Sequence, residues 1–164
     1  IIYDMNSIYN TPGYGWQLAH GATALTESWQ AYAYLSNNHL CLGHLMGWFF
    51  SGLGGIGQTD QSTAFKQIVI HPQPAGDVRE AQTSYQSPYG QIVSDWKKND
   101  NEFILHVEIP ANTTAFVYLP TTDASNITES GVLLKNLGMN FKGESNKYTV
   151  VTVGSGIYNF NVKQ

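Results

Sequence analysis

The sequence predicts a protein of the α plus β class, in which a helical first part is followed by an antiparallel β-sandwich. The first 56 of the 164 residues contain no Lys or Arg, two carboxylates and 10 of the 21 aromatic side chains. Beyond residue 56 the spacing of apolar residues changes from the period of helices to the alternation of strands. A shift in composition near residues 57–63 accompanies this change. We therefore expect two domains, residues 1–60 and residues 61–164.

The first part is expected to contain helices over residues 15–24 and 38–51, where apolar residues recur at helical spacing. Residues 36–38 (SNN) are good candidates for the N-cap of the second helix, and the glycines within residues 52–55 provide its C-terminal stop. This second helix is apolar nearly all round. Such a helix would expose large apolar patches in water, so we expect it to lie inside a larger assembly.

The second part is expected to form short strands that are rich in β-branched and aromatic residues and are separated by turn residues. Phe103, Leu105 and Val107 alternate with Ile104, His106 and Glu108. This alternation predicts one buried face and one mixed face on that strand. Regular short strands of this kind favour an antiparallel sandwich. The expected strands are residues 67–71, 91–97, 102–109, 114–119, 147–153 and 156–162.

Composition excludes several functional classes. The formal net charge of −4 disfavours a nucleic-acid partner. Cys41 is the only cysteine, so neither an internal disulfide nor a thiolate metal cluster is expected. The most apolar stretch, residues 40–56, is interrupted by glycines and is shorter than the roughly 18 to 20 residues that cross a bilayer, so no membrane span is expected. No signal peptide is visible, and the chain starts without Met, which agrees with a fragment.

Glu27 is the candidate catalytic residue. It is the only Glu in the first 56 residues, it lies two positions before Trp29, and Tyr32 and Tyr34 follow closely. A glycosidase subsite needs a carboxylate that moves a proton and aromatic rings that stack on the sugar. Spacing alone nevertheless favours a structural role, in which Glu27 caps or orients a loop.

Histidines give a weaker signal. His39 could donate a hydrogen bond to a sugar hydroxyl, although spacing alone favours a cap or a satisfied core histidine. His20 and His44 have no partner at metal-ligand spacing, so we expect no metal site. No cofactor is expected.

Several motifs together resemble family 78 α-L-rhamnosidases. Residues 12–16 (PGYGW), 21–29 (GATALTESW) and 36–39 (SNNH) resemble the last part of the catalytic barrel of that family. Residues 65–74 (FKQIVIHPQP), 87–90 (SPYG) and 154–158 (GSGIY) resemble its C-terminal β-sandwich. The order and spacing of these motifs agree over nearly the whole chain, which is more specific than any one of them.

The resemblance implies the terminal helices of an (α/α)6 barrel followed by an antiparallel β-sandwich. It also implies an inverting enzyme that removes terminal α-L-rhamnosyl residues, with Glu27 as the general base and with His39 and Trp29 in the sugar-binding site. The general acid of the family lies in an earlier barrel segment. The implied partners are therefore a rhamnose-containing glycoside and the remainder of the barrel, and this chain alone should be inactive or nearly so.

Two departures from the family pattern bear on specificity. Many members have Trp immediately before the base, whereas this chain has Thr26, so one stacking or packing surface is absent. The interval from Glu27 to His39 is also short for the family. Both departures bear on the contact with the sugar more than on the position of the base.

Other readings remain open at this point. One is a non-catalytic carbohydrate-binding or scaffolding sandwich with a helical adaptor, which would bind sugar on its sheet face through Trp96, Tyr85 or Tyr89. Another is a related barrel glycosidase that acts on a different sugar, since one fold hosts several chemistries. The sequence is compatible with a periplasmic, an extracellular or a cytoplasmic location in a bacterium.

Overall fold

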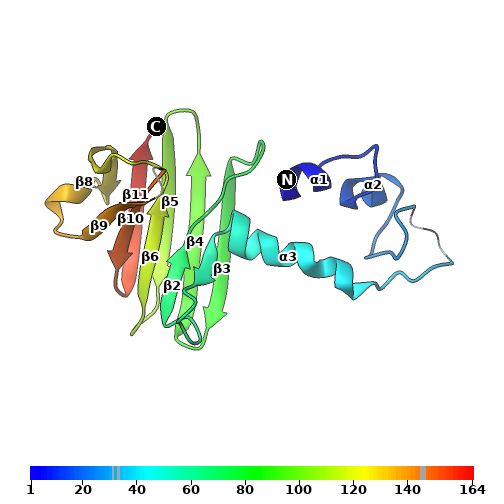
Figure 1. Ribbon diagram of the computed structural model, residues 1–164, viewed down its shortest axis with the longest axis horizontal. Coiled ribbons are helices and arrows are strands. Elements are labelled where there is room, and N and C mark those ends of the chain that lie inside the picture. Colours follow the sequence, from blue (N-terminus) through cyan, green and yellow to red (C-terminus); the bar gives the residue numbers. More distant parts are fainter. Residues whose placement is uncertain (31, 33, 145–146) are drawn as a thin grey trace. The chain divides into compact units, whose positions relative to one another are not determined.

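The computed structural model describes residues 1–30, 32, 34–144 and 147–164, and these fall into two compact units. The first unit comprises Ile1–Gly47 together with Ala75–Asp77, and the second comprises Trp48–Pro74 together with Val78–Gln164. Within the described residues, all strands belong to the second unit, and the first consists of short helices joined by irregular chain (Figure 1).

The helical elements are short. They are α1 (Ile2–Asn6), α2 (Tyr14–Ala19), the 3₁₀ helix η1 (Leu40–His44), α3 (Leu45–Trp48) and the π-helical η2 (Phe49–Leu53). The helix expected over residues 38–51 is thus present as three consecutive elements over residues 40–53. Its expected stop is also confirmed, because η2 ends at Leu53 within the glycine cluster.

The helix expected over residues 15–24 ends early, at Ala19. Gly21 adopts a left-handed φ of 81°. Its N–H donates to the carbonyl of Leu18 at 3.1 Å, and the N–H of Ala22 donates to the carbonyl of Gln17 at 2.9 Å. These bonds form a Schellman motif, which terminates a helix where glycine occupies the left-handed position. The prediction extended too far because Gly21 is a stop signal inside the apolar pattern.

The expected N-cap at residues 36–38 is wrong. The cap of η1 is His39, and its side chain makes no capping hydrogen bond. The backbone of this segment is instead engaged with residues 25–27: the N–H of Glu27 donates to the carbonyl of Ser36, and the N–H of His39 donates to that of Leu25, both at 2.8 Å. Backbone pairing with residues 25–27 thus holds the chain in a non-helical conformation up to His39, and the helix begins at Leu40.

The second unit is a sandwich of two sheets. One contains five strands in the order β1-β2-β6-β10-β9, and the other contains six in the order β3-β4-β5-β11-β7-β8. All pairs are antiparallel except β2 with β6, which is parallel. The strands are β1 (Ile56–Gln58), β2 (Gln67–Ile70), β3 (Glu80–Ser87), β4 (Gly90–Lys98), β5 (Glu102–Ile109), β6 (Thr114–Leu119), β7 (Ile127–Glu129), β8 (Val132–Leu133), β9 (Asn140–Glu144), β10 (Tyr148–Val153) and β11 (Gly156–Lys163), with short 3₁₀ turns η3 (Ala124–Asn126) and η4 (Leu134–Asn136).

The core of the sandwich lies between the two sheets and follows the predicted alternation. Phe103, Leu105 and Val107 of β5 are buried, together with side chains from the facing sheet such as Ile68 and Val117. Burial of alternate residues on both sheets is what holds a sandwich together. The expected antiparallel β-sandwich is therefore confirmed, apart from the one parallel pair.

The chain enters the sandwich through a tightly packed turn at residues 53–55. Trp96 Nε1 donates to the carbonyl of Leu53 at 2.8 Å, and Ser94 Oγ donates to that of Gly54 at 2.7 Å. Gly55 has a left-handed φ of 73°, and a Cβ there would lie 2.1 Å from the nitrogen of Pro72. Only glycine fits such a close backbone approach.

A row of polar side chains crosses the outer face of the six-stranded sheet. Registers place Gln82, Asp95, His106 and Asn159 side by side on β3, β4, β5 and β11. His106 Nδ1 lies 2.8 Å from Asn159 Oδ1, and its Nε2 lies 3.3 Å from Glu108 Oε1. Since both neighbours are acceptors, the protonated imidazolium can donate from both ring nitrogens.

The pKa of His106 is accordingly raised above its ordinary value of 6.5, chiefly by the hydrogen bond to Asn159. Partial burial opposes this effect, and Glu108 and Asp95 add to it. A raised pKa in the folded state stabilises the fold fully below the unfolded pKa, and that stabilisation is lost as the pH rises through the folded pKa.

We expect this loss to be visible in the pH dependence of stability. Between about pH 6 and pH 8 the urea midpoint of the sandwich should fall further in the wild type than in the His106→Gln variant, which has no imidazole to titrate. The effect should be small because His106 is partly exposed. Identical pH profiles for the two proteins would contradict the interaction.

Candidate functional site

Glu27 lies in the first unit, on an irregular segment between α2 and the backbone-paired residues 36–39, and its side chain is exposed to solvent. The N–H of Glu27 donates to the carbonyl of Ser36 at 2.8 Å. The carboxylate thus stands on a chain segment whose backbone is fixed while its side chain remains open to solvent. This is the arrangement that a proton-accepting group needs if it is to meet a substrate.

Gln17 of α2 forms hydrogen bonds with the residues on both sides of Glu27. Gln17 Nε2 lies 2.7 Å from Thr26 Oγ1, 3.1 Å from the Thr26 carbonyl and 3.2 Å from the Ser28 carbonyl. Thr26 Oγ1 also donates to the Ser28 carbonyl at 2.7 Å. Gln17 and Thr26 are both 3% exposed, so the hydrogen bonds lie in a protected environment. Gln17 was not predicted from the sequence, where the available signal was a single amide within an otherwise apolar helix, and Thr26 stood out only as a departure from the family pattern.

His39 lies beside the Glu27 segment through backbone pairing. Its N–H donates to the carbonyl of Leu25 at 2.8 Å, and the residue is half-buried. The structure thus brings the segments of Glu27 and His39, which are 12 positions apart, next to each other. The irregular backbone of residues 25–27 and 36–39 carries this pairing, which local patterns do not reveal.

Trp29 presents an aromatic surface next to the irregular segment that carries Glu27. It is 38% exposed, and its ring meets the ring of Tyr14 edge-on with centroids 6.4 Å apart. The hydroxyl of Tyr14 donates in turn to the carbonyl of Leu42. Trp29 is therefore supported on one side and open on the other, a combination that suits stacking on a sugar.

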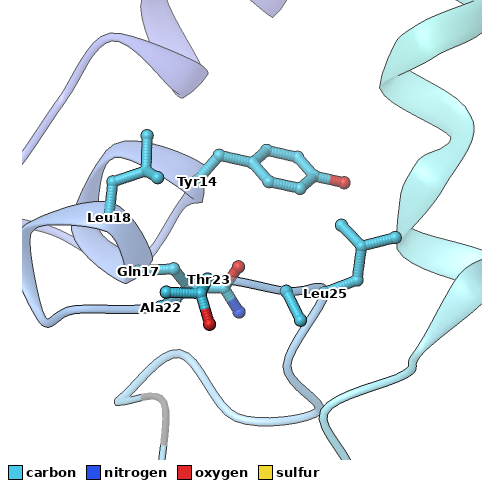
Figure 2. Close-up of a pocket in the computed structure, with 7 residues that line it drawn as sticks. Tyr14, Gln17, Leu18, Ala22, Thr23 and Leu25 are labelled. Carbon is cyan, nitrogen blue, oxygen red and sulfur yellow. The ribbon is translucent and has the colours of Figure 1, made fainter.

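A mostly apolar pocket of about 320 Å³ lies next to this loop. In Figure 2, Tyr14 lies on one side of the pocket, and Ala22, Thr23 and Leu25 lie on the other. Gln17 also lines the pocket. Glu27, Trp29 and His39 are not among its lining residues.

One of the three aromatic residues proposed to bind sugar on the sheet face is buried in the core. Trp96 is 1% exposed, and its ring stacks on Phe103 inside the core with centroids 6.0 Å apart. The expectation that Trp96 could bind sugar is therefore wrong. Tyr85 packs against Phe65, and Tyr89 lies under the ammonium of Lys66, although both tyrosines keep exposed surface.

Two family models match consecutive parts of the chain. Residues 1–53 match the bacterial alpha-L-rhamnosidase 6 hairpin glycosidase domain, and residues 55–133 match the bacterial alpha-L-rhamnosidase C-terminal domain. The chain belongs to the bacterial α-L-rhamnosidase family. It corresponds to the C-terminal part of these enzymes, and the resemblance inferred from the sequence motifs is confirmed.

Curated rhamnosidases are similar over most of this chain. An alpha-L-rhamnosidase of Formosa agariphila is 28% identical over 159 residues, which are 95% of this chain and 16% of the relative. One from Streptomyces avermitilis is 26% identical over 160 residues, 92% of this chain and 15% of the relative. The chain thus spans about a sixth of the length of these relatives.

Solved rhamnosidase structures share the fold. The alpha-L-rhamnosidase from Dictyoglumus thermophilum matches with a TM-score of 0.86 at 26% identity, over 99% of this chain and 18% of that chain. The Streptomyces avermitilis alpha-L-rhamnosidase complexed with L-rhamnose matches with a TM-score of 0.83 at 26% identity, over 98% of this chain and 16% of that chain. In the part of this chain that the structure describes, no helix is long and apolar enough to span a membrane.

Proposed function

We propose that this chain carries the water-activating side of an inverting α-L-rhamnosidase active site, with Glu27 as the general base. The observation that carries the proposal is the exposed carboxylate of Glu27 on a segment that Gln17 and Ser36 hold by its backbone. This segment lies within the residues that match the glycosidase domain. A fixed backbone with an open side chain suits a group that must meet a bound substrate in one orientation.

The proposed substrate class is a glycoside with a terminal α-L-rhamnosyl residue. The Streptomyces avermitilis neighbour is described as a complex with L-rhamnose, which supports this sugar class here. We assign His39 to a hydrogen bond with the bound rhamnose, and Trp29 to stacking against its apolar face. The partly exposed ring of Trp29 and the backbone pairing next to His39 support these two roles.

In the proposed reaction, Glu27 takes a proton from the water that attacks the anomeric carbon. A second carboxylic acid protonates the departing glycosidic oxygen on the opposite face of the sugar. Inversion requires these two carboxyl groups to lie about 6.5 to 9.5 Å apart, with the water between the base and the anomeric carbon. We place the acid in a barrel segment that this chain does not contain.

The same proposal assigns residues 1–60 to the terminal helices of an (α/α)6 barrel and residues 61–164 to the C-terminal β-sandwich. Several large apolar side chains of the first unit support it, since Leu18, Leu40 and Met46 are 64%, 73% and 56% exposed. Exposed apolar surface of this kind marks a region that packs against something else. The remainder of the barrel is the partner that we propose.

The experiment that tests this function is the Glu27→Gln exchange in the longer enzyme that carries this segment, with kcat and KM measured on an aryl α-L-rhamnoside. The proposal predicts a collapse of kcat with KM almost unchanged. A variant that keeps the wild-type kcat would overturn the assignment of the base.

A further inference from the structure

Gln17 is a buried polar side chain, 3% exposed, that contacts residues 26–28 around Glu27. Its amide group carries two hydrogens, and three acceptors on Thr26 and Ser28 surround its nitrogen at 2.7 to 3.2 Å. All three acceptors belong to the residues immediately before and after Glu27. One side chain therefore holds the backbone on both sides of the carboxylate.

The peptide group that joins Thr26 to Glu27 is held at both ends. Its carbonyl oxygen accepts from Gln17 at 3.1 Å, and its N–H donates to the Ser36 carbonyl at 2.8 Å. Since a peptide group is planar, two such anchors restrict rotation about the chain at Glu27. The direction in which the Glu27 side chain leaves the backbone is restricted with it.

The helix that carries Gln17 is itself fixed. The Schellman motif at Gly21 closes its C-terminal end. A Cβ at Gly15 would lie 2.5 Å from the carbonyl oxygen of Ile8, so the helix backbone packs directly against that segment. Because α2 is fixed, the hydrogen bonds of Gln17 fix residues 26–28 relative to this helix.

We propose that Gln17 is a positioning residue for the general base, which it holds in the orientation needed to deprotonate water. This inference rests on the proposed function of Glu27. Gln17 is 3% exposed and its amide nitrogen is engaged by Thr26 and Ser28, so it acts on Glu27 through residues 26–28. Loss of its hydrogen bonds leaves the buried Thr26 carbonyl without the Gln17 donor and lets residues 26–28 move, while the Glu27 carboxylate itself is retained.

The test compares Gln17→Met, which keeps the length and volume of the side chain but has no donor, with Gln30→Met. Gln30 is an exposed glutamine three positions after Glu27 and is the matched control. In the longer enzyme, Gln17→Met should lower kcat roughly 10- to 100-fold with KM nearly unchanged, because small misplacements of reacting groups are costly. Gln30→Met should keep the wild-type kcat and KM.

Thr26 provides a second pair of variants if Gln17→Met does not fold. Thr26→Ser keeps the hydroxyl that bridges Gln17 and the Ser28 carbonyl, and Thr26→Val removes it at similar volume. We expect Thr26→Ser to retain kcat and Thr26→Val to lower it. Equal kcat values in the two variants would overturn the inference.

A second readout in the longer enzyme needs no activity. Amide hydrogen exchange at Glu27 should speed up in Gln17→Met, while amides of β4 and β5 should keep their wild-type rates. Unchanged exchange at Glu27, or an unchanged kcat, would overturn the positioning role.

If Gln17→Met keeps kcat while Glu27→Gln abolishes it, only this inference fails. If Glu27→Gln keeps kcat, the proposed function fails whatever the result for Gln17.

Discussion

Exchanging Glu27 for Gln should lower kcat for an aryl α-L-rhamnoside by about 10²- to 10⁴-fold in the longer enzyme, the usual contribution of a general acid or base. Glutamine has the same length and still forms hydrogen bonds, but its amide cannot accept a proton at neutral pH. The exchange should leave KM nearly unchanged, since it affects an interaction made chiefly in the transition state. Steady-state kinetics on both proteins provide the measurement.

Asp4 offers the matched control for this exchange. It is the only other carboxylate in the first 56 residues, it is exposed, and it lies on α1 outside the proposed site. Asp4→Asn should therefore keep the wild-type kcat. An equal loss of kcat in both variants would mean that charge in this region, and not the chemistry of Glu27, accounts for the effect.

Trp96→Ala should destabilise the sandwich by about 3 to 5 kcal/mol, the range typical of emptying a large aromatic site in a core. Trp96 is 1% exposed, stacks on Phe103 and donates to the Leu53 carbonyl at 2.8 Å. The exchange removes the packing and also leaves that carbonyl without its donor. Urea unfolding followed by far-UV circular dichroism measures the change.

Two further variants separate the contributions at this position. Trp96→Phe keeps most of the ring volume and loses the hydrogen bond, so it should cost about 1 to 3 kcal/mol. Ile157→Ala removes an apolar side chain that is 62% exposed on the same sheet, and it should change stability by no more than about 0.5 kcal/mol. A Trp96→Ala variant as stable as Ile157→Ala would contradict the placement of Trp96 in the core.

The sequence predicted the strongly alternating strands well. The bounds of β5 and β6 agree with the expected residues 102–109 and 114–119, because apolar side chains on one face of each strand are buried in one core. The strand β3 was missed. Its alternate positions Glu80, Gln82, Ser84 and Gln86 are exposed, and the intervening ones include Ala81 and Thr83, so no clear apolar period marks it. Its pairing with β4 creates the strand.

The candidate site was predictable only in part. Glu27, Trp29 and His39 could be selected because rare residue types and a family motif mark them. The role of Gln17 in holding the Glu27 segment could not be predicted from the sequence. Gln17 contacts Thr26 and Ser28 only because the chain reverses direction at Gly21, after the end of α2. Turn geometry and tertiary pairing of this kind have no fixed period in the sequence.

Hydrolysis of an aryl α-L-rhamnoside by the purified 164-residue chain alone tests the proposed division of the active site. We propose that the base lies in this chain and the general acid in another part of the enzyme. We therefore expect no measurable turnover, since loss of the acid and of most substrate contacts removes several orders of magnitude of rate. Turnover by this chain that disappears in the Glu27→Gln variant would contradict this proposal, because a complete active site would then lie within these residues.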